Sequence, residues 1–193
     1  MVREKTVLSI RELTVGGLFS ALIAAGAFIK ITLPTEPMPM HFTLQWFFVL
    51  LAGLLLDKRL AATSVGAYLL LGLIGIPVFA SGGGPSYLIR PTFGYLLGFA
   101  VAAYTMAWLC ERFRVAGFMR LLAVSVAGLL IYYGIGVFYY FFICRLIISK
   151  EVTWQILLFN CFLLTVAPDF GLCLGAVSVA AKLRGVVRRT LCR

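Results

Sequence analysis

Acidic residues and histidine are scarce in this sequence of 193 residues, which has seven aspartates and glutamates and one histidine. Metal enzymes need several such ligands close together, and the single histidine, His41, is expected to be an ordinary polar residue. The five cysteines form no CxxC pair and are expected to be small apolar packing residues. A phosphate-binding loop of the form GxxxxGKS or GxxxxGKT is also missing. We therefore expect no catalytic residues, no metal and no cofactor, and an intramembrane enzyme is the least favoured class.

Apolar residues are instead abundant, at 62% of the chain with a mean hydropathy of +1.04. Soluble domains carry about 45–50% apolar residues, and a helix needs about 20 of them to cross a bilayer. Six apolar runs with short connections nearly fill the chain. We expect an all-α polytopic membrane protein, with six transmembrane helices in a single domain over residues 1–193 and no soluble ATPase domain. The runs are 13–33, 42–56, 60–77, 91–109, 121–143 and 152–181.

The 17 basic residues lie mostly at the ends of these runs, which favours a topology signal over nucleic-acid binding. With the N-terminus inside the cell, 13 basic residues fall on the inner side and 4 on the outer side. The outer four are Lys30, Arg90, Arg145 and Lys150. The positive-inside rule then predicts that both termini are cytoplasmic in a multi-pass protein of the cell membrane.

Prolines gather in the loops that this topology places outside, over 34–39 and 77–91. Proline fixes φ and lowers the entropy that a loop loses on ordering. Two stiff outer loops indicate a shaped outer surface, such as a lid over a pocket. The alternative, that these prolines simply terminate helices, is compatible with the first.

Asp169 is the one acid inside an apolar run, where a charge costs roughly 2.5–3.5 kcal/mol and rarely lacks a role. Pro168 before it is typical of a helix start. We predict that the last run is broken, with one piece over 152–167 and the sixth helix beginning at about Pro168. Because a broken helix at membrane depth lines a cavity or other protein, Asp169 is a candidate acceptor for ligand N–H groups. The alternative is that it only caps its own helix.

The loop from Ser81 to Arg90 is a second candidate site. Its glycines, including Gly83 and Gly84, allow close backbone approach, and Tyr87 supplies a polar tip beside Ser86. Arg90 is a candidate partner for a ligand carboxylate. Arg90 is equally compatible with an arginine that reaches lipid headgroups at the outer interface.

Polar residues in other runs extend the candidate set. Thr43 and Gln45, near the outer end of the second run, face either the same cavity or neighbouring helices. Tyr132 or Tyr133 lies deep enough to line a pocket, although core packing is favoured for both. The remaining candidate ligand-binding residues are Tyr95 and Asn160.

Small residues four apart, at Gly17, Ala21 and Ala25, form a flat strip on the first helix. Such strips let another helix pack closely. The partner is either a helix of the same bundle or a separate membrane subunit.

Four ordered motifs resemble those of the BioY family. Residues 91–99 read PTFGYLLGF and are similar to the family's PTxGYLxGF signature. Residues 39–45 (PMHFTLQ), 52–57 (AGLLLD) and 72–79 (GLIGIPVF) resemble the motifs PxPxTLQ, AGxLLG and GLxGLPVF. The likeness runs from about residue 13 to residue 184.

The resemblance implies a function. BioY proteins are the biotin-specific substrate-capture (S) components of energy-coupling factor (ECF) transporters, which bind biotin near the outer surface beneath the outer loops. They dock through an AxxxA pattern in the first helix, which Ala21 and Ala25 match. The implied partners are a transmembrane coupling subunit and two ATPase subunits.

One position departs from the family pattern. The family's last helix often opens PGDLxK, and Leu172 stands here at the lysine position. A polar partner for the ligand is therefore missing, and Arg90 is a hypothetical replacement. The alternatives are a related ligand such as a biotin precursor and, in another class, a membrane scaffold without a ligand.

Overall fold

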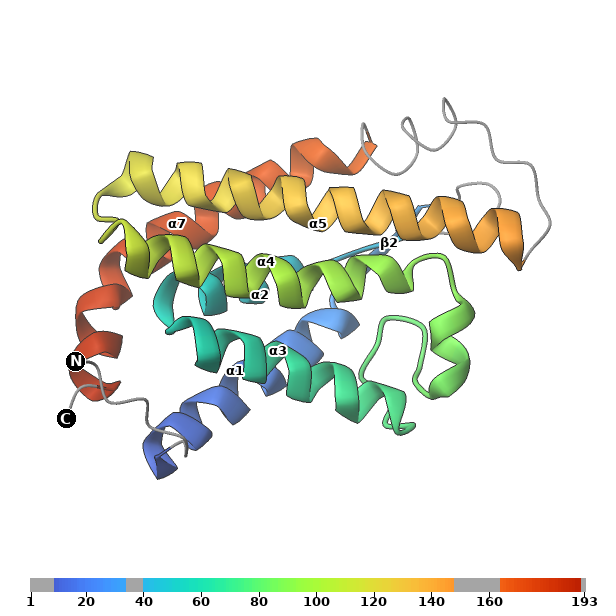
Figure 1. Cartoon of the computed structure of the whole chain (residues 1–193), viewed down its shortest axis with the longest axis horizontal. Coiled ribbons are helices and arrows are strands. Elements are labelled where there is room, and N and C mark those ends of the chain that lie inside the picture. Colours follow the sequence, from blue (N-terminus) through green and yellow to red (C-terminus); the bar gives the residue numbers. More distant parts are fainter. Residues whose placement is uncertain (1–8, 34–39, 148–163, 192–193) are drawn as a thin grey trace.

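The computed structural model describes residues 9–33, 40–147 and 164–191, which form a bundle of helices with one short strand pair (Figure 1). The strands are β1 (Lys30–Leu33) and β2 (Met40–Thr43), and a 3-10 helix, η1, covers Pro85–Ile89. The α-helices among these residues are α1 (Ile10–Phe28), α2 (Gln45–Leu55), α3 (Lys58–Leu73), α4 (Phe93–Arg112), α5 (Phe118–Leu146) and α7 (Leu164–Leu191).

Four of these helices, α1, α4, α5 and α7, are long and apolar enough to cross a membrane. Helix α2 has 11 residues and α3 has 16, so each is shorter than the roughly 20 residues of a full crossing. The chain is thus a multi-pass membrane protein with six α-helices in its described part. The first turn of α1 and the last turns of α7 lie toward the same end of the bundle (Figure 1).

The boundary between the first two apolar runs differs from the prediction. Helix α1 ends at Phe28 rather than continuing to residue 33, and β1 and β2 pair antiparallel with Ile31 opposite Phe42. Isoleucine and threonine are β-branched and favour strands, but hydropathy alone does not separate such a strand from the end of a helix. The second helix consequently begins at Gln45, after the strand.

The predicted break at Pro168 is wrong, because α7 is already helical at Leu164 and continues through the proline. Proline lacks an N–H, so the Leu164 carbonyl loses its helical donor. An open break would leave more backbone groups unpaired at membrane depth, which costs more than one lost bond. The continuous helix also places Thr165 four residues before Asp169, on the same face.

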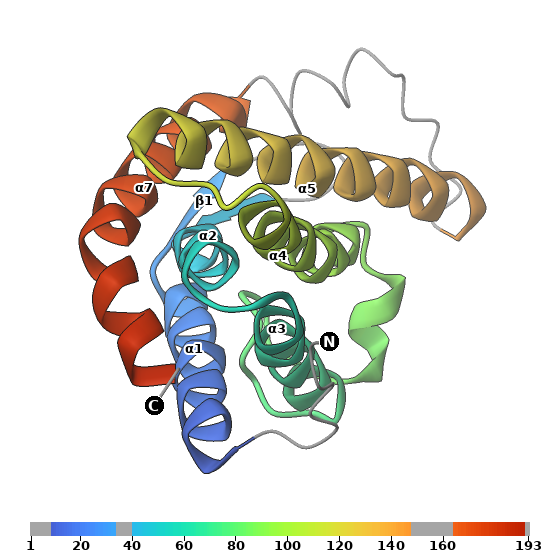
Figure 2. The ribbon, with the colours of Figure 1, turned by 60° about the vertical axis from the view of Figure 1, so that its left-hand side comes forward.

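Helix α2 lies inside the bundle, where it packs against α1, α4 and α7 (Figure 2). Helices α4 and α5 approach closely at several glycines, two of which lie against Tyr132 and Tyr95. A Cβ on Gly98 would lie 2.9 Å from the Tyr132 carbonyl oxygen, and one on Gly136 would lie 2.2 Å from the Tyr95 ring. Only glycine permits these two approaches, which fix Tyr95 and Tyr132 between the helices.

Candidate ligand-binding site

A cavity lies at the end of the bundle that carries the strand pair and η1, and six parts of the chain line it. Strand β2 and the start of α2 form one side, and α4 and α5 form another. The loop around η1 closes the mouth, and α7 contributes Thr165 and Asp169.

Asp169 is the acid of this cavity and is only 2% exposed. The Tyr133 hydroxyl oxygen lies 2.6 Å from Asp169 Oδ2 and 2.7 Å from Thr165 Oγ1. A hydroxyl has one hydrogen and a carboxylate only accepts, so Tyr133 donates to Asp169 and Thr165 donates to Tyr133. Asp169 Oδ1 accepts no hydrogen bond from the described residues, which leaves acceptor capacity for a ligand.

Aromatic rings form the wall beside this carboxylate. Trp46 and Tyr132 stack with ring centroids 4.6 Å apart and an interplanar angle of 15°. Phe99 stacks on the same pair, at 5.8 Å from Trp46 and 5.2 Å from Tyr132. Tyr95 contacts Tyr132 at 5.3 Å. Such a wall offers flat apolar surface to a small ring system.

Gln45 provides a second buried polar group on the cavity wall. Its amide nitrogen donates to the Tyr68 hydroxyl, and the Thr43 hydroxyl donates to its Oε1 at 3.2 Å. These bonds fix the orientation of the amide, so Gln45 and Thr43 present a defined pair of polar groups.

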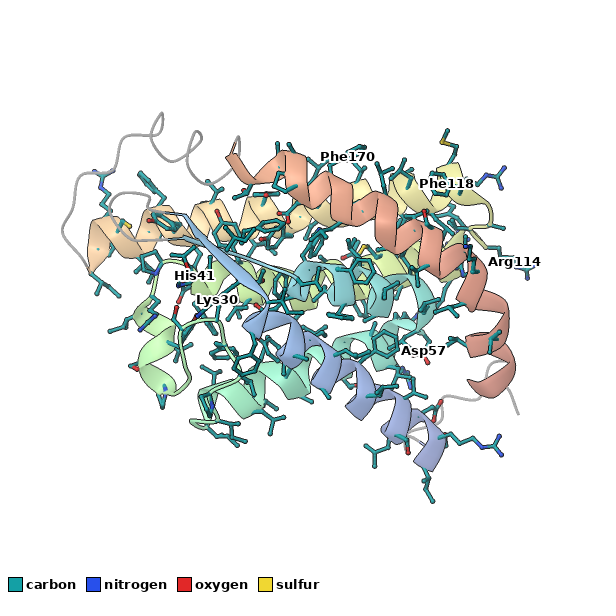
Figure 3. All side chains as sticks on the ribbon, turned by 180° about the vertical axis from the view of Figure 1, so that it is seen from behind. Lys30, His41, Asp57, Arg114, Phe118 and Phe170 are labelled. Atoms are coloured by element: carbon teal, nitrogen blue, oxygen red, sulfur yellow. The ribbon has the colours of Figure 1, made fainter. Side chains whose placement is uncertain are left out.

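Basic groups surround the mouth of the cavity. His41 lines the cavity, and its Nδ1 lies 3.0 Å from the Thr32 hydroxyl across the strand pair. Burial first, and then the charges of Lys30 and Arg90, lower the pKa of His41 below its ordinary value. His41 is therefore neutral at pH 7, between two fixed cations. Figure 3 shows Lys30 and His41 at this end of the molecule.

The loop around η1 is folded against the mouth through Tyr87 and Lys30. Lys30 Nζ donates to the Ala80 carbonyl, which ties the strand pair to the loop. Tyr87 is buried, and the Arg90 guanidinium carbon lies 5.0 Å from its ring centre. Burial raises the pKa of Tyr87, although hydrogen bonds with Ser81 and Thr92 act in the opposite direction. Tyr87 therefore remains a neutral phenol at neutral pH.

Known proteins resemble this chain over nearly its whole length. A family model described as the BioY family matches residues 2–189. The chain belongs to the BioY family. A probable biotin transporter BioY of Lysinibacillus sphaericus is 36% identical over 188 residues, or 97% of this chain and 92% of that protein. The biotin transporter BioY of Thermotoga maritima is 46% identical over 129 residues, or 66% of this chain and 73% of that protein.

A solved structure has the same fold as this BioY-family chain. It is the crystal structure of the S-component for biotin from an ECF-type ABC transporter, with a TM-score of 0.81 and 21% identity. The similarity covers 93% of this chain and 95% of that one. The helical arrangement described above is therefore that of an S-component.

Five of the predicted ligand-binding residues lie together on the cavity lining: Thr43, Gln45, Tyr87, Tyr95 and Asp169. Four others do not line it. Ser86 and Arg90 are exposed, the Gly84 N–H donates to the Gly72 carbonyl at 2.7 Å, and Gly83 lies against the Ile76 carbonyl. Asn160 lies outside the described residues.

Several lining residues were not among the predicted site residues, chiefly His41, Trp46, Phe99 and Thr165, and Tyr132 lines the cavity although core packing was favoured for it. The aromatic residues sit in apolar runs, where packing is the simpler interpretation. Thr165 was missed because the helix was predicted to begin after it. Leu172, at the family's lysine position, is half-buried against the core and does not line the cavity.

The small residues of helix α1 lie on two different faces of the helix. Gly16 and Ser20 are buried, and the Ser20 hydroxyl donates to the Ser64 carbonyl of α3 at 2.6 Å. Gly17, Ala21 and Ala25 are exposed, and nothing lies within 4 Å of a Cβ added at Gly17. Within the described chain, the strip at Gly17, Ala21 and Ala25 is thus an open surface.

Proposed function

We propose that this chain captures biotin in the cavity beneath the strand pair and serves as the substrate-binding subunit of an ECF-type transporter. The cavity faces outward, both termini are cytoplasmic, and the chain itself catalyses no reaction. The single observation that carries this proposal is the buried Asp169 carboxylate, with a free acceptor oxygen, in a cavity walled by aromatic rings.

The chemistry of biotin suits this arrangement. Its ureido ring presents two N–H donors and a carbonyl acceptor. The donors match Asp169, and the carbonyl finds a donor in the second N–H of the Gln45 amide, since the first N–H is donated to the Tyr68 hydroxyl. A buried carboxylate that accepts N–H bonds discriminates strongly against ligands without those donors, because its desolvation is then uncompensated.

The rest of the ligand fits the remaining parts of the site. The fused thioether ring lies against the stacked Trp46, Phe99 and Tyr132, where flat apolar contact is available. The valerate chain points to the mouth, and its carboxylate lies near Lys30 and Arg90. In this arrangement Arg90, rather than a lysine at position 172, supplies the positive charge.

Transport requires partners that hydrolyse ATP, which we propose to be a transmembrane coupling subunit and two ATPase subunits. The open strip at Gly17, Ala21 and Ala25 is the surface proposed for docking. A flat strip of small residues permits the close helix contact that membrane association favours.

Isothermal titration of the purified full chain with biotin and desthiobiotin tests the ligand. Tight binding of biotin, with weaker binding of desthiobiotin, supports the proposal because desthiobiotin keeps the ureido ring but lacks the thioether ring. Tighter binding of desthiobiotin than of biotin would indicate that the natural ligand is a biotin precursor. Absence of heat and of any thermal shift with either compound would favour a scaffold without a ligand.

A further inference from the structure

A second hollow lies at the opposite end of the bundle, between the loop that joins α4 to α5 and the later turns of α7. Arg114, Val115 and Gly117 line it from the loop, and Arg184 lines it from the helix. Figure 3 shows Arg114 at this end, far from Lys30 and His41. The biotin proposal makes no use of this hollow.

Arg184 is the central group of the hollow. Its Nη1 donates to the Val115 carbonyl, which fixes the guanidinium against the loop. Its Nε is buried and has no hydrogen-bond partner in the described chain. A guanidinium carries five N–H donors, so most of the donor capacity of Arg184 is unused.

The surroundings of Arg184 are also positive. Arg114 is exposed on the rim, and neither arginine forms an ion pair with a described residue. Helix α5 begins beside them at Gly117 without a side-chain cap, so its first N–H groups and its dipole add positive potential.

Two acidic side chains at this end, Glu111 and Asp57, already form hydrogen bonds with α3. Glu111 accepts from the Lys58 amide at 2.8 Å and lies 3.7 Å from the Lys58 ammonium. Asp57 caps α3 by accepting from the amides of Arg59 and Leu60. Both carboxylates have partners on α3, and the two arginines of the hollow suit an anion with several acceptor oxygens.

Exposed apolar side chains flank this basic hollow. Phe113 is 64% exposed, Met119 is 76% exposed and Val186 is 62% exposed, and Figure 3 shows Phe118 at the same end as Arg114. A soluble anion gains nothing from such neighbours, whereas the acyl chains of a lipid pack against them. Basic pockets between membrane helices are a known setting for anionic lipid headgroups.

We propose that this hollow binds the phosphate group of an anionic phospholipid, with Arg184 and Arg114 as its ligands. In the orientation proposed above, the lipid belongs to the cytoplasmic leaflet. Arg184 donates to the phosphate oxygens from the buried side, and Arg114 closes over the headgroup from the rim. The acyl chains run along the apolar surface that Phe113 and Phe118 expose.

Calorimetric titration of a short-chain phosphatidylglycerol into the delipidated full chain tests this site. A charged contact with an anionic lipid contributes about 1 kcal/mol, or about fivefold in affinity. Arg184→Gln keeps a donor for the Val115 carbonyl, and Arg114→Gly suits that residue's positive φ of 45°. Each variant should therefore bind about fivefold more weakly, and the double variant about 25-fold more weakly.

Arg120→Gln is the matched control, because Arg120 is an exposed arginine at the same end that does not line the hollow. It should bind the lipid as the parent does. An equal loss in Arg120→Gln, or no loss in the double variant, would overturn the site. Inorganic phosphate binding as tightly as phosphatidylglycerol would assign the hollow to a soluble anion instead.

Biotin affinity and the thermal unfolding midpoint are measured on every variant to verify folding. Both should match the parent, since the hollow is remote from the cavity. A parent chain that binds the lipid but not biotin would refute the proposed function and leave this inference standing.

Discussion

The two ends of the bundle use polar side chains in opposite ways. At the end with the strand pair, single polar groups such as Gln45 and Asp169 are buried among aromatic rings and held by specific hydrogen bonds. At the other end, Arg114 is exposed on a short loop and Arg184 is half-buried on a helix.

This difference shows how each end recognises a ligand. A buried polar group pays a desolvation cost that only a matching ligand compensates, so it confers selectivity. Exposed positive charges act through a field that many anions share. On the two proposals above, the cavity end selects one compound and the basic end accepts a class of headgroups.

The comparison is tested most strongly by removing the charge of one acid at each end. Asp169→Asn should weaken biotin binding about 100-fold, because hydrogen bonds to a charged group contribute about 1.5–3 kcal/mol each. Asp57→Asn is the matched control, since asparagine caps a helix about as well as aspartate. Isothermal titration measures both, and equal affinities would remove Asp169 from the site.

The hydrogen-bond chain behind Asp169 is tested with Tyr133→Phe. Loss of the hydroxyl frees the carboxylate to rotate, so biotin affinity should fall about tenfold. Tyr139→Phe is the control on the same helix, because the Tyr139 hydroxyl donates to the Leu88 carbonyl outside the cavity. If both variants bind like the parent, α7 alone orients Asp169.

The mouth of the cavity is tested by removing one cation. Arg90→Gln should weaken biotin binding about fivefold, as expected for an exposed charge pair of about 1 kcal/mol. Affinity for a neutral biotin amide should not change, because that ligand carries no carboxylate. Arg120→Gln at the other end serves as the control. An equal loss for biotin and its amide would show that Arg90 acts by shaping the loop around Tyr87.

The smallest expected effect is a pH dependence from His41. Burial and the cations Lys30 and Arg90 lower its pKa in the free protein, and a bound carboxylate raises it again. The complex then holds more protons than the free protein near the ordinary His pKa of about 6.5. Biotin affinity should thus rise two- to threefold, to order of magnitude, as pH falls from about 8 to about 6.

His41→Asn should abolish this slope while leaving the affinity at about pH 8 close to that of the parent. Titrations with biotin across this pH range measure the slope in the parent and in the variant. A slope that persists in His41→Asn would assign the proton to another group.

Much of the cavity was predictable from single residues that are out of place. Asp169 in an apolar run predicted a polar lining residue, because isolated polar groups at membrane depth rarely lack a role, whereas Gln45 was equally compatible with the cavity and with neighbouring helices. The prediction was most direct where a single polar residue stands in an otherwise apolar run.

The aromatic lining was not predictable in this way. Trp46 and Phe99 resemble their neighbours in composition, and only helix packing decides which ring faces the cavity. The strand pair was also hidden, because Ile31 and Thr32 continue the apolar run of α1 in hydropathy. Their pairing with β2 depends on residues that are not local in sequence.

The last helix shows the limit of a local rule. Pro168 predicted a helix start, but the bundle holds a continuous helix around it. A break there would leave several backbone groups unpaired at membrane depth, which costs more than the one bond that Pro168 removes. The family motifs nevertheless indicated the correct fold, because they mark contacts that a single segment does not specify.

The close approaches at Gly98 and Gly136 have a consequence for mutational scanning. Each glycine lies against a tyrosine that lines the cavity, so any larger residue must displace Tyr132 or Tyr95. A screen for loss of biotin uptake would therefore return these two positions together with Asp169, although neither glycine lines the cavity. Expression level would not distinguish the glycine variants from the Asp169 variants. A ligand with a smaller ring system would restore binding only in the glycine variants.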